Sequence, residues 1–140
     1  MSKFSGLALN VGAASRMTLL NPITRQPIRD SKGNEAWIDL HSASAAIGRK
    51  HDRDMTDKQI KMQRRRLSAE EIEADFIEKL SKLTAAWFLV NMYDGSPIDL
   101  ECTQANAREL YSDPDIPWIR EQVAEFIQDL GNFPGAASTS

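Results

Sequence analysis

The stretch that decides the fold runs from residue 68 to residue 95 and reads SAEEIEADFIEKLSKLTAAWFLVNMYDG. It opens with a capping box, in which Ser68 accepts a hydrogen bond from the Glu71 amide and the Glu71 carboxylate reaches back. Apolar residues then recur at spacings of three and four, as on one face of an α-helix. They are Ile72, Phe76, Leu80, Leu83, Trp87 and Val90. The pattern predicts one long central helix over about 68–94, with Trp87 buried on its core face and Gly95 as a left-handed terminus.

Upstream of this stretch the chain has β character. Residues 16–20 form one short run suited to a strand, and Trp37–Leu40 form a second. Between them Asn21-Pro22 interrupts the pattern, because a residue before proline is pushed out of the helical region. We expect a hairpin or meander over 16–41 that packs on the central helix, since two strands alone are barely stable. Residues 1–15 are small and weakly patterned, which predicts a flexible arm.

The remaining segments read as helices. Ser42 or Ser44 caps a helix over about 42–66, and a short extended piece follows at 97–101. Thr103 caps a helix over 103–111, and Pro117 is the first residue of a last helix over 117–130. Residues 134–140 read as a disordered tail. The expected fold is therefore mainly α within the α+β class: one small helical domain over 16–133, with a short N-terminal β-hairpin or meander on a long central helix.

Composition excludes several classes of protein. The chain has 140 residues, of which 41% are hydrophobic and 26% charged, as in an ordinary globular domain. Its apolar runs fall far short of the ~20 residues that span a bilayer. No basic and apolar leader opens it. We therefore expect a cytoplasmic protein with no membrane partner.

Residue types suited to chemistry are scarce. Cys102, His41 and His51 are the only cysteine and histidines, which leaves little for a zinc site or a nucleophile–base pair. Asp94, Asp99 and Glu101 do not match the spacing of a calcium loop, so helix-end and turn roles explain them better. We expect no enzyme activity, no metal and no cofactor.

The net charge of −3 hides a polarised chain. Residues 49–66 carry a net +5 and residues 94–130 a net −7. These regions either lie side by side within one fold, or they face outward and allow weak head-to-tail self-association. Arg64, Arg65 and Arg66 form the sharpest basic run, which is either a nucleic-acid contact or a solvated helix end. No aromatic residue interleaves this run to stack on bases, so nucleic acid is not the expected partner.

Two aromatic residues join the arginines as candidates for protein interaction. Trp118 lies in the first turn of the last helix, where it belongs either to the core or to an interface. Phe133 lies beyond that helix, where an aromatic residue suggests docking onto the domain or into a partner. The candidate interaction residues are thus Arg64, Arg65, Arg66, Trp118 and Phe133.

The order of these segments resembles a known family. Asn21–Pro27 (NPITRQP) sits at the hairpin turn, Trp37–Leu40 leads into His41-Ser42-Ala43-Ser44, and Trp87 precedes Asp94-Gly95. Thr103–Ala107 opens a helix, and Asp129–Phe133 (DLGNF) closes the last one. Over about residues 16–133 this set is similar to the tail assembly chaperones of long-tailed bacteriophages and gene transfer agents. Their turn reads Asp-Pro-x-Thr-Gly-x-Pro, so Asn21 stands in place of aspartate and Arg25 in place of glycine. Ala43 stands in place of an acidic residue.

The resemblance implies a non-enzymatic protein with two partners. Such chaperones bind the long helical tape measure protein, keep it soluble and help to recruit tail-tube subunits during tail assembly. In many relatives a frameshifted longer form meets the tube protein. The implied location is the host bacterial cytoplasm, with no copy in the mature virion. The alternative function, from another class, is a small nucleic-acid-binding or regulatory domain that uses the basic helix over 58–66.

Overall fold

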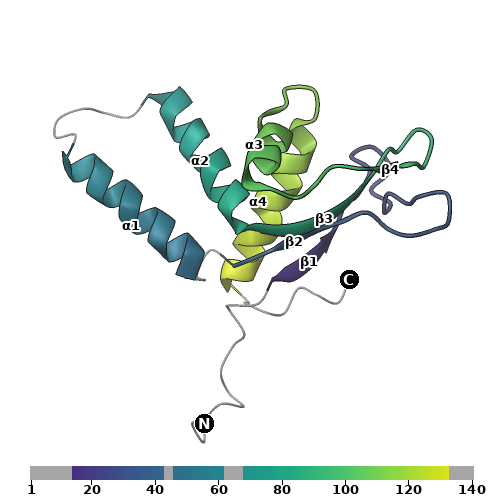
Figure 1. The fold of residues 1–140 in the computed structure, drawn as a ribbon, viewed down its shortest axis with the longest axis horizontal. Coiled ribbons are helices and arrows are strands. Elements are labelled where there is room, and N and C mark those ends of the chain that lie inside the picture. The colour runs from purple at the N-terminus through teal and green to yellow at the C-terminus, as the bar shows by residue number, and fades with distance from the viewer. Residues whose placement is uncertain (1–13, 43–45, 62–67, 133–140) are drawn as a thin grey trace, which may run out of the picture.

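A four-stranded antiparallel sheet organises the domain (Figure 1). The computed structural model describes residues 14–42, 46–61 and 68–132. Within them the strands follow one another in the order β1-β2-β3-β4. Their bounds are Ser15–Thr18 for β1, Trp37–Leu40 for β2, Thr84–Val90 for β3 and Pro97–Ile98 for β4. The expected N-terminal hairpin is confirmed, because β1 pairs with β2 and places Met17 opposite Ile38.

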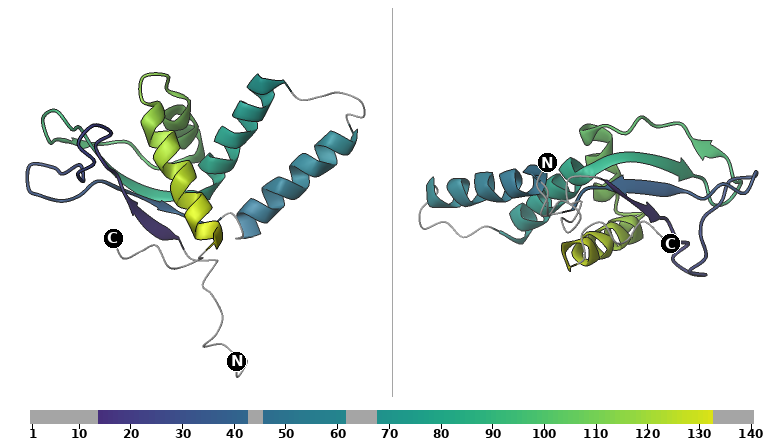
Figure 2. Two further views of the ribbon diagram at one scale, coloured as in Figure 1. Left: turned by 180° about the vertical axis from the view of Figure 1, so that it is seen from behind. Right: turned by 90° about the horizontal axis from the view of Figure 1, so that it is seen from below.

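Four helices accompany the sheet in the described ranges. They are α1 (Ala46–Lys61), α2 (Ala69–Leu83), α3 (Gln104–Ser112) and α4 (Pro117–Asn132). Helices α3 and α4 lie on one side of the sheet, whereas α1 stands outermost, beyond α2 (Figures 1 and 2). The α+β class expected from the sequence is therefore confirmed.

The prediction of one long central helix over about 68–94 was wrong. The helix ends at Leu83, and Thr84–Val90 (TAAWFLV) form β3, paired with β2 so that Trp37 faces Phe88. The competing signal is a continuous apolar run of six residues, Ala85–Val90, which follows the β-branched Thr84, contains two aromatics and suits a buried strand as well as a helix. Pairing with β2 then decides the outcome. Trp87 is consequently only partly buried, and its Nε1–H donates to the Leu100 carbonyl at 2.8 Å.

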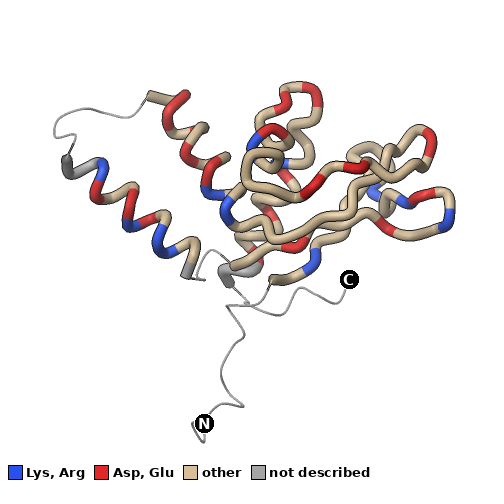
Figure 3. Tube along the Cα trace, viewed as in Figure 1, with Lys and Arg blue, Asp and Glu red and all other residues tan. Residues whose placement is uncertain are grey.

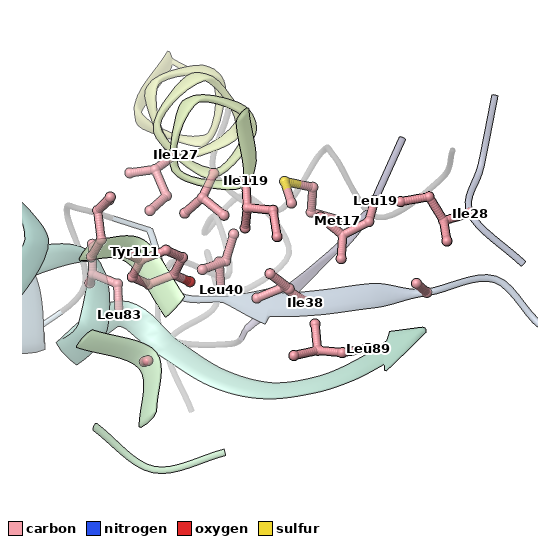
Figure 4. Packing of buried hydrophobic residues seen from close by; sticks show 14 of the residues in the cluster. Met17, Leu19, Ile28, Ile38, Leu40, Leu83, Leu89, Tyr111, Ile119 and Ile127 are labelled. Carbon is pink, nitrogen blue, oxygen red and sulfur yellow. The ribbon is translucent and has the colours of Figure 1, made fainter. Parts of the chain in front are cut away.

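The core lies between the sheet and the two C-terminal helices (Figure 4). Ile119 and Ile127 of α4 point toward the sheet residues Met17, Ile38 and Leu40. Tyr111 of α3 is 1% exposed, and its hydroxyl lies 2.6 Å from Thr84 Oγ1. The core thus joins residues from both ends of the described chain, and it fixes the hairpin against α4.

The predicted helix starts are confirmed. The Glu71 N–H donates to Ser68 Oγ at 3.1 Å, and the Asn106 N–H donates to Thr103 Oγ1 at 3.1 Å. Pro117 is the first residue of α4, as expected. The middle of the helix expected over 42–66 is confirmed as α1, whereas 43–45 and 62–67, where its ends were expected, lie outside the described residues.

The expected domain limits are tested only in part. The domain begins at least one residue before 16, because Ser15 opens β1 and is buried. The proposed arm, up to residue 13, and the proposed tail over 134–140 lie outside the described residues.

Candidate protein-interaction surface

The turn over Asn21–Pro27 has a tightly defined backbone. The Asn21 Oδ1 accepts hydrogen bonds from the N–H groups of Ile23 (2.9 Å) and Thr24 (3.2 Å). The Asn21 carbonyl accepts from the Arg25 N–H at 2.9 Å. Arg25 then takes a left-handed backbone with φ of 61°, which is the conformation that favours glycine. The side chain of Asn21 and the backbone of Arg25 therefore define this turn.

A second turn, between β3 and β4, lies beside the hairpin. The Gly95 N–H donates to the Asn91 carbonyl, and Gly95 has φ of 73°. Its carbonyl accepts from the Ser31 N–H at 3.0 Å, which joins the two loops. A Cβ on Gly95 would meet that Ser31 nitrogen at 3.0 Å, so space as well as conformation requires glycine here. The predicted left-handed glycine is confirmed, although it serves a strand turn rather than a helix end.

An apolar groove of about 230 Å³ opens between these loops and the start of α4. Its lining residues come from four regions, which are the hairpin, the segment from the end of β3 to β4, α3, and the loop before α4 together with the first turn of α4. Most of the lining side chains are apolar, and Asn91 contributes an amide. The apolar lining residues include Ile28, Leu89, Ile98, Leu110, Ile116 and Trp118. Trp118 is partly buried against the core and lines the groove as well. Trp118 therefore packs against the core and also lines the candidate interface.

Large hydrophobic side chains are exposed around this groove. Tyr93 is 92% exposed and Ile98 is 47% exposed, and both line it. Ile23, at the tip of the neighbouring turn, is 89% exposed. Exposed apolar residues scattered singly are ordinary, but a group of them around an apolar groove is typical of an interaction site.

Acidic residues adjoin the lining residues of the groove in the sequence. Asp94, Asp99, Glu109 and Asp115 are exposed, and each is the direct sequence neighbour of a lining residue. Figure 3 shows acidic residues along the β3–β4 segment and the loop before α4. Ser96 donates to the Asp94 carboxylate from its N–H (2.8 Å) and its hydroxyl (2.6 Å), and these bonds lower the pKa of Asp94. The turn role expected for Asp94 is confirmed.

The opposite face of the sheet carries a polar arrangement. The Arg16 guanidinium donates to the Asp39 carboxylate at 2.9 and 3.2 Å and lies 3.6 Å from the ring centre of Trp37. Asp39 and the Trp37 ring thus already engage this guanidinium. We therefore place the candidate surface at the apolar groove.

Helix α1 docks on α2 through a polar cluster that the sequence did not predict. His51 is 3% exposed, with Nε2 at 2.7 Å from the Asp75 carboxylate and Nδ1 at 3.1 Å from Lys82 Nζ. Lys79 pairs with Asp52 at 2.8 Å in the same interface. His51 thus has a structural role in this interface. Its partners are 24 and 31 residues away, and only the packing of α1 on α2 brings them together.

Four of the five candidate interaction residues lie outside the part of the chain that the structure describes. Arg64, Arg65, Arg66 and Phe133 lie outside the described residues, and of the basic segment 58–66 only the Lys58 side chain is described. In the described ranges no ion pair joins 49–61 to 94–130. Glu73 and Glu78 of α2 instead pair with Arg120 and Arg108. Self-association through the two charged regions stays a prediction.

In the described part of the chain, the residues considered for chemistry form no metal-binding cluster. Cys102 is a free, half-buried thiol, and burial raises its pKa, with a smaller contribution from Asp39. Within 14–42, 46–61 and 68–132 no group of three or more His, Cys, Asp or Glu side chains is placed to hold a metal ion. No helix in these ranges is both long enough and apolar enough to span a membrane.

Comparison of the chain with protein-family models, with curated proteins and with solved structures found no match.

Proposed function

We propose that the chain is a non-enzymatic tail assembly chaperone, which binds a tape measure protein, keeps it soluble and helps to recruit tail-tube subunits. The observation that carries the proposal is the geometry of the Asn21–Pro27 turn. It bears on the two positions where this turn departs from the Asp-Pro-x-Thr-Gly-x-Pro pattern of that family.

At both departures the residue has the geometry that aspartate or glycine favours in such a turn. Asn21 accepts two backbone hydrogen bonds through Oδ1, which is the role of an aspartate carboxylate in the same turn. Arg25 adopts the left-handed backbone that a glycine at this position would take without strain. The turn thus has the hydrogen bonds and backbone that aspartate and glycine favour at these two positions, which supports the resemblance where its sequence departs from the pattern.

The surface beside this turn suits a protein that binds proteins. Tyr93 and Ile98 are exposed at an apolar groove, and Ile23 is exposed on the neighbouring turn. The groove is smaller than the roughly 300–1,000 Å³ typical of small-molecule sites. It therefore suits a few apolar side chains of a partner better than it suits a cofactor.

The proposal predicts that a long helical protein, the candidate tape measure protein, is encoded beside the gene for this chain, and it is tested by co-expression of the two. We expect the soluble fraction of the tape measure protein to rise several-fold when the chain is present. The comparison variant is Gly95→Val. A β-branched residue at φ of 73° meets the backbone of Ser31 and disturbs both loops, so this variant should raise the soluble fraction less than the native chain does. An unchanged soluble fraction with the native chain contradicts the proposal.

A further inference from the structure

We infer that the apolar groove binds the apolar face of a basic, amphipathic α-helix. The identity of the partner, a tape measure protein, rests on the proposed function. The location of the site and the chemistry of the bound segment rest on the observations below.

The charge around the groove selects a basic partner. The acidic rim is defined by Asp94, Asp99, Glu109 and Asp115, which are exposed residues whose Cα atoms each lie about 3.8 Å from the Cα of a lining residue. Among the described residues none of these four carboxylates takes part in an ion pair. The net charge near the groove is therefore negative and favours a basic partner over an acidic one.

Nearby cations do not cancel this rim. Arg29 and Arg120 are also direct neighbours of lining residues. Arg29 pairs with Glu35 at 3.3 Å, and Arg120 pairs with Glu73 at 2.8 Å. Both arginines thus balance carboxylates elsewhere, and the groove keeps its negative surroundings.

The backbone at this edge favours a helix over an added strand. A peptide that extends a sheet needs unpaired N–H and C=O groups along the edge strand. In β4, Pro97 has no N–H, and the Ile98 carbonyl accepts from the Leu100 N–H at 3.0 Å. The groove therefore offers side-chain contacts rather than a strand edge, and a helix presents apolar side chains at i, i+3, i+4 and i+7 for such contacts.

Two designed helical peptides test the chemistry with the full chain. Both carry the same leucine stripe, flanked by lysines in one and by glutamates in the other. We expect the lysine peptide to bind the native chain at least tenfold more tightly, and raised salt to reduce that preference. The double variant Asp99→Lys with Asp115→Lys should lose the preference. Equal affinity for both peptides, or no saturable binding of the lysine peptide, overturns the inference.

Two single variants test the location. Ile98→Glu places a charge in the groove and should weaken binding of the lysine peptide at least tenfold. Ile72→Glu is the matched control, because Ile72 is a 57% exposed isoleucine on α2 that does not line the groove. Its affinity should stay within twofold of the native chain. Equal effects of the two variants overturn the assignment.

Comparison with the tape measure protein separates this inference from the proposed function. Saturable, Ile98-dependent peptide binding without a tape measure complex supports the groove and contradicts the proposed function. A tape measure complex that survives Ile98→Glu supports the proposed function and contradicts the groove as its site.

Discussion

The side chain of Gln122 on α4 hydrogen-bonds both backbone groups of Leu20, which lies 102 residues earlier. Its Oε1 accepts from the Leu20 N–H at 3.1 Å, and its Nε2 donates to the Leu20 carbonyl at 2.8 Å. The amide thus makes the pair of bonds that a neighbouring strand would make. It holds the hairpin next to α4, between the Asn21 turn and the core.

Replacing Gln122 by alanine should therefore destabilise the fold. The change leaves two partly buried backbone groups without their partner, so the free energy of unfolding should fall by about 1–3 kcal/mol. Urea denaturation measures this loss. Gln128→Ala, an exposed glutamine on the same helix, is the control and should change stability by less than about 0.5 kcal/mol. Similar losses for the two variants would contradict the role given to Gln122.

Arg25 provides a test of the turn. Arg25→Gly should leave stability unchanged or raise it by up to about 1 kcal/mol, because relief of the left-handed strain offsets the larger entropy loss of glycine. Arg25→Val should lower stability, because a β-branched side chain suits a positive φ poorly. Chemical denaturation of both variants checks the sign of each change. A glycine variant less stable than the valine variant would mean that the turn has another shape.

Tyr111 gives the fold an alkaline pH dependence. Burial raises its pKa in the folded state, although the hydrogen bond with Thr84 opposes this effect, whereas an unfolded tyrosine ionises near pH 10. Above about pH 10 the unfolded chain therefore binds fewer protons at this site than the folded chain. Its contribution lowers the stability by up to about 1.4 kcal/mol per pH unit until the folded pKa is reached. Denaturation between pH 9 and 11 should show this slope, and Tyr111→Phe should lack it. The same slope in both proteins would exclude Tyr111 as its source.

His51 should hold α1 on α2 without affecting the stability of α3 and α4. Its ring is a buried contact between α1 and α2, whereas the exposed Asp52–Lys79 pair contributes only ~0–1 kcal/mol. In His51→Ala we expect hydrogen exchange of α1 amides to accelerate at least tenfold while α3 and α4 keep their protection. Lys50→Ala changes an exposed neighbour and serves as the control. Uniform loss of protection over all four helices would show that α1 is part of the cooperative core.

Local signals made much of the fold predictable from the sequence. Strand β2, the caps Ser68 and Thr103, and Pro117 at the start of α4 all depend on residues within a few positions of one another. The division of 68–94 into α2 and β3 was missed because the apolar run fits both periods and the pairing partner, β2, lies more than 40 residues upstream. The groove was missed for a similar reason. Its walls come from four separate regions, and of its lining residues only Trp118 was singled out beforehand as a possible interface residue.

The proposed binding of a tape measure protein is measured from the molar mass of the purified complex. The chain is co-expressed with the candidate tape measure protein, and the mass is measured by size-exclusion chromatography with light scattering. We predict one stable species that contains the tape measure protein and more than one copy of the chain, and that loses chain copies with Ile98→Glu but not with Ile72→Glu. Elution of the native chain apart from the tape measure protein, with no shared peak, would contradict the account.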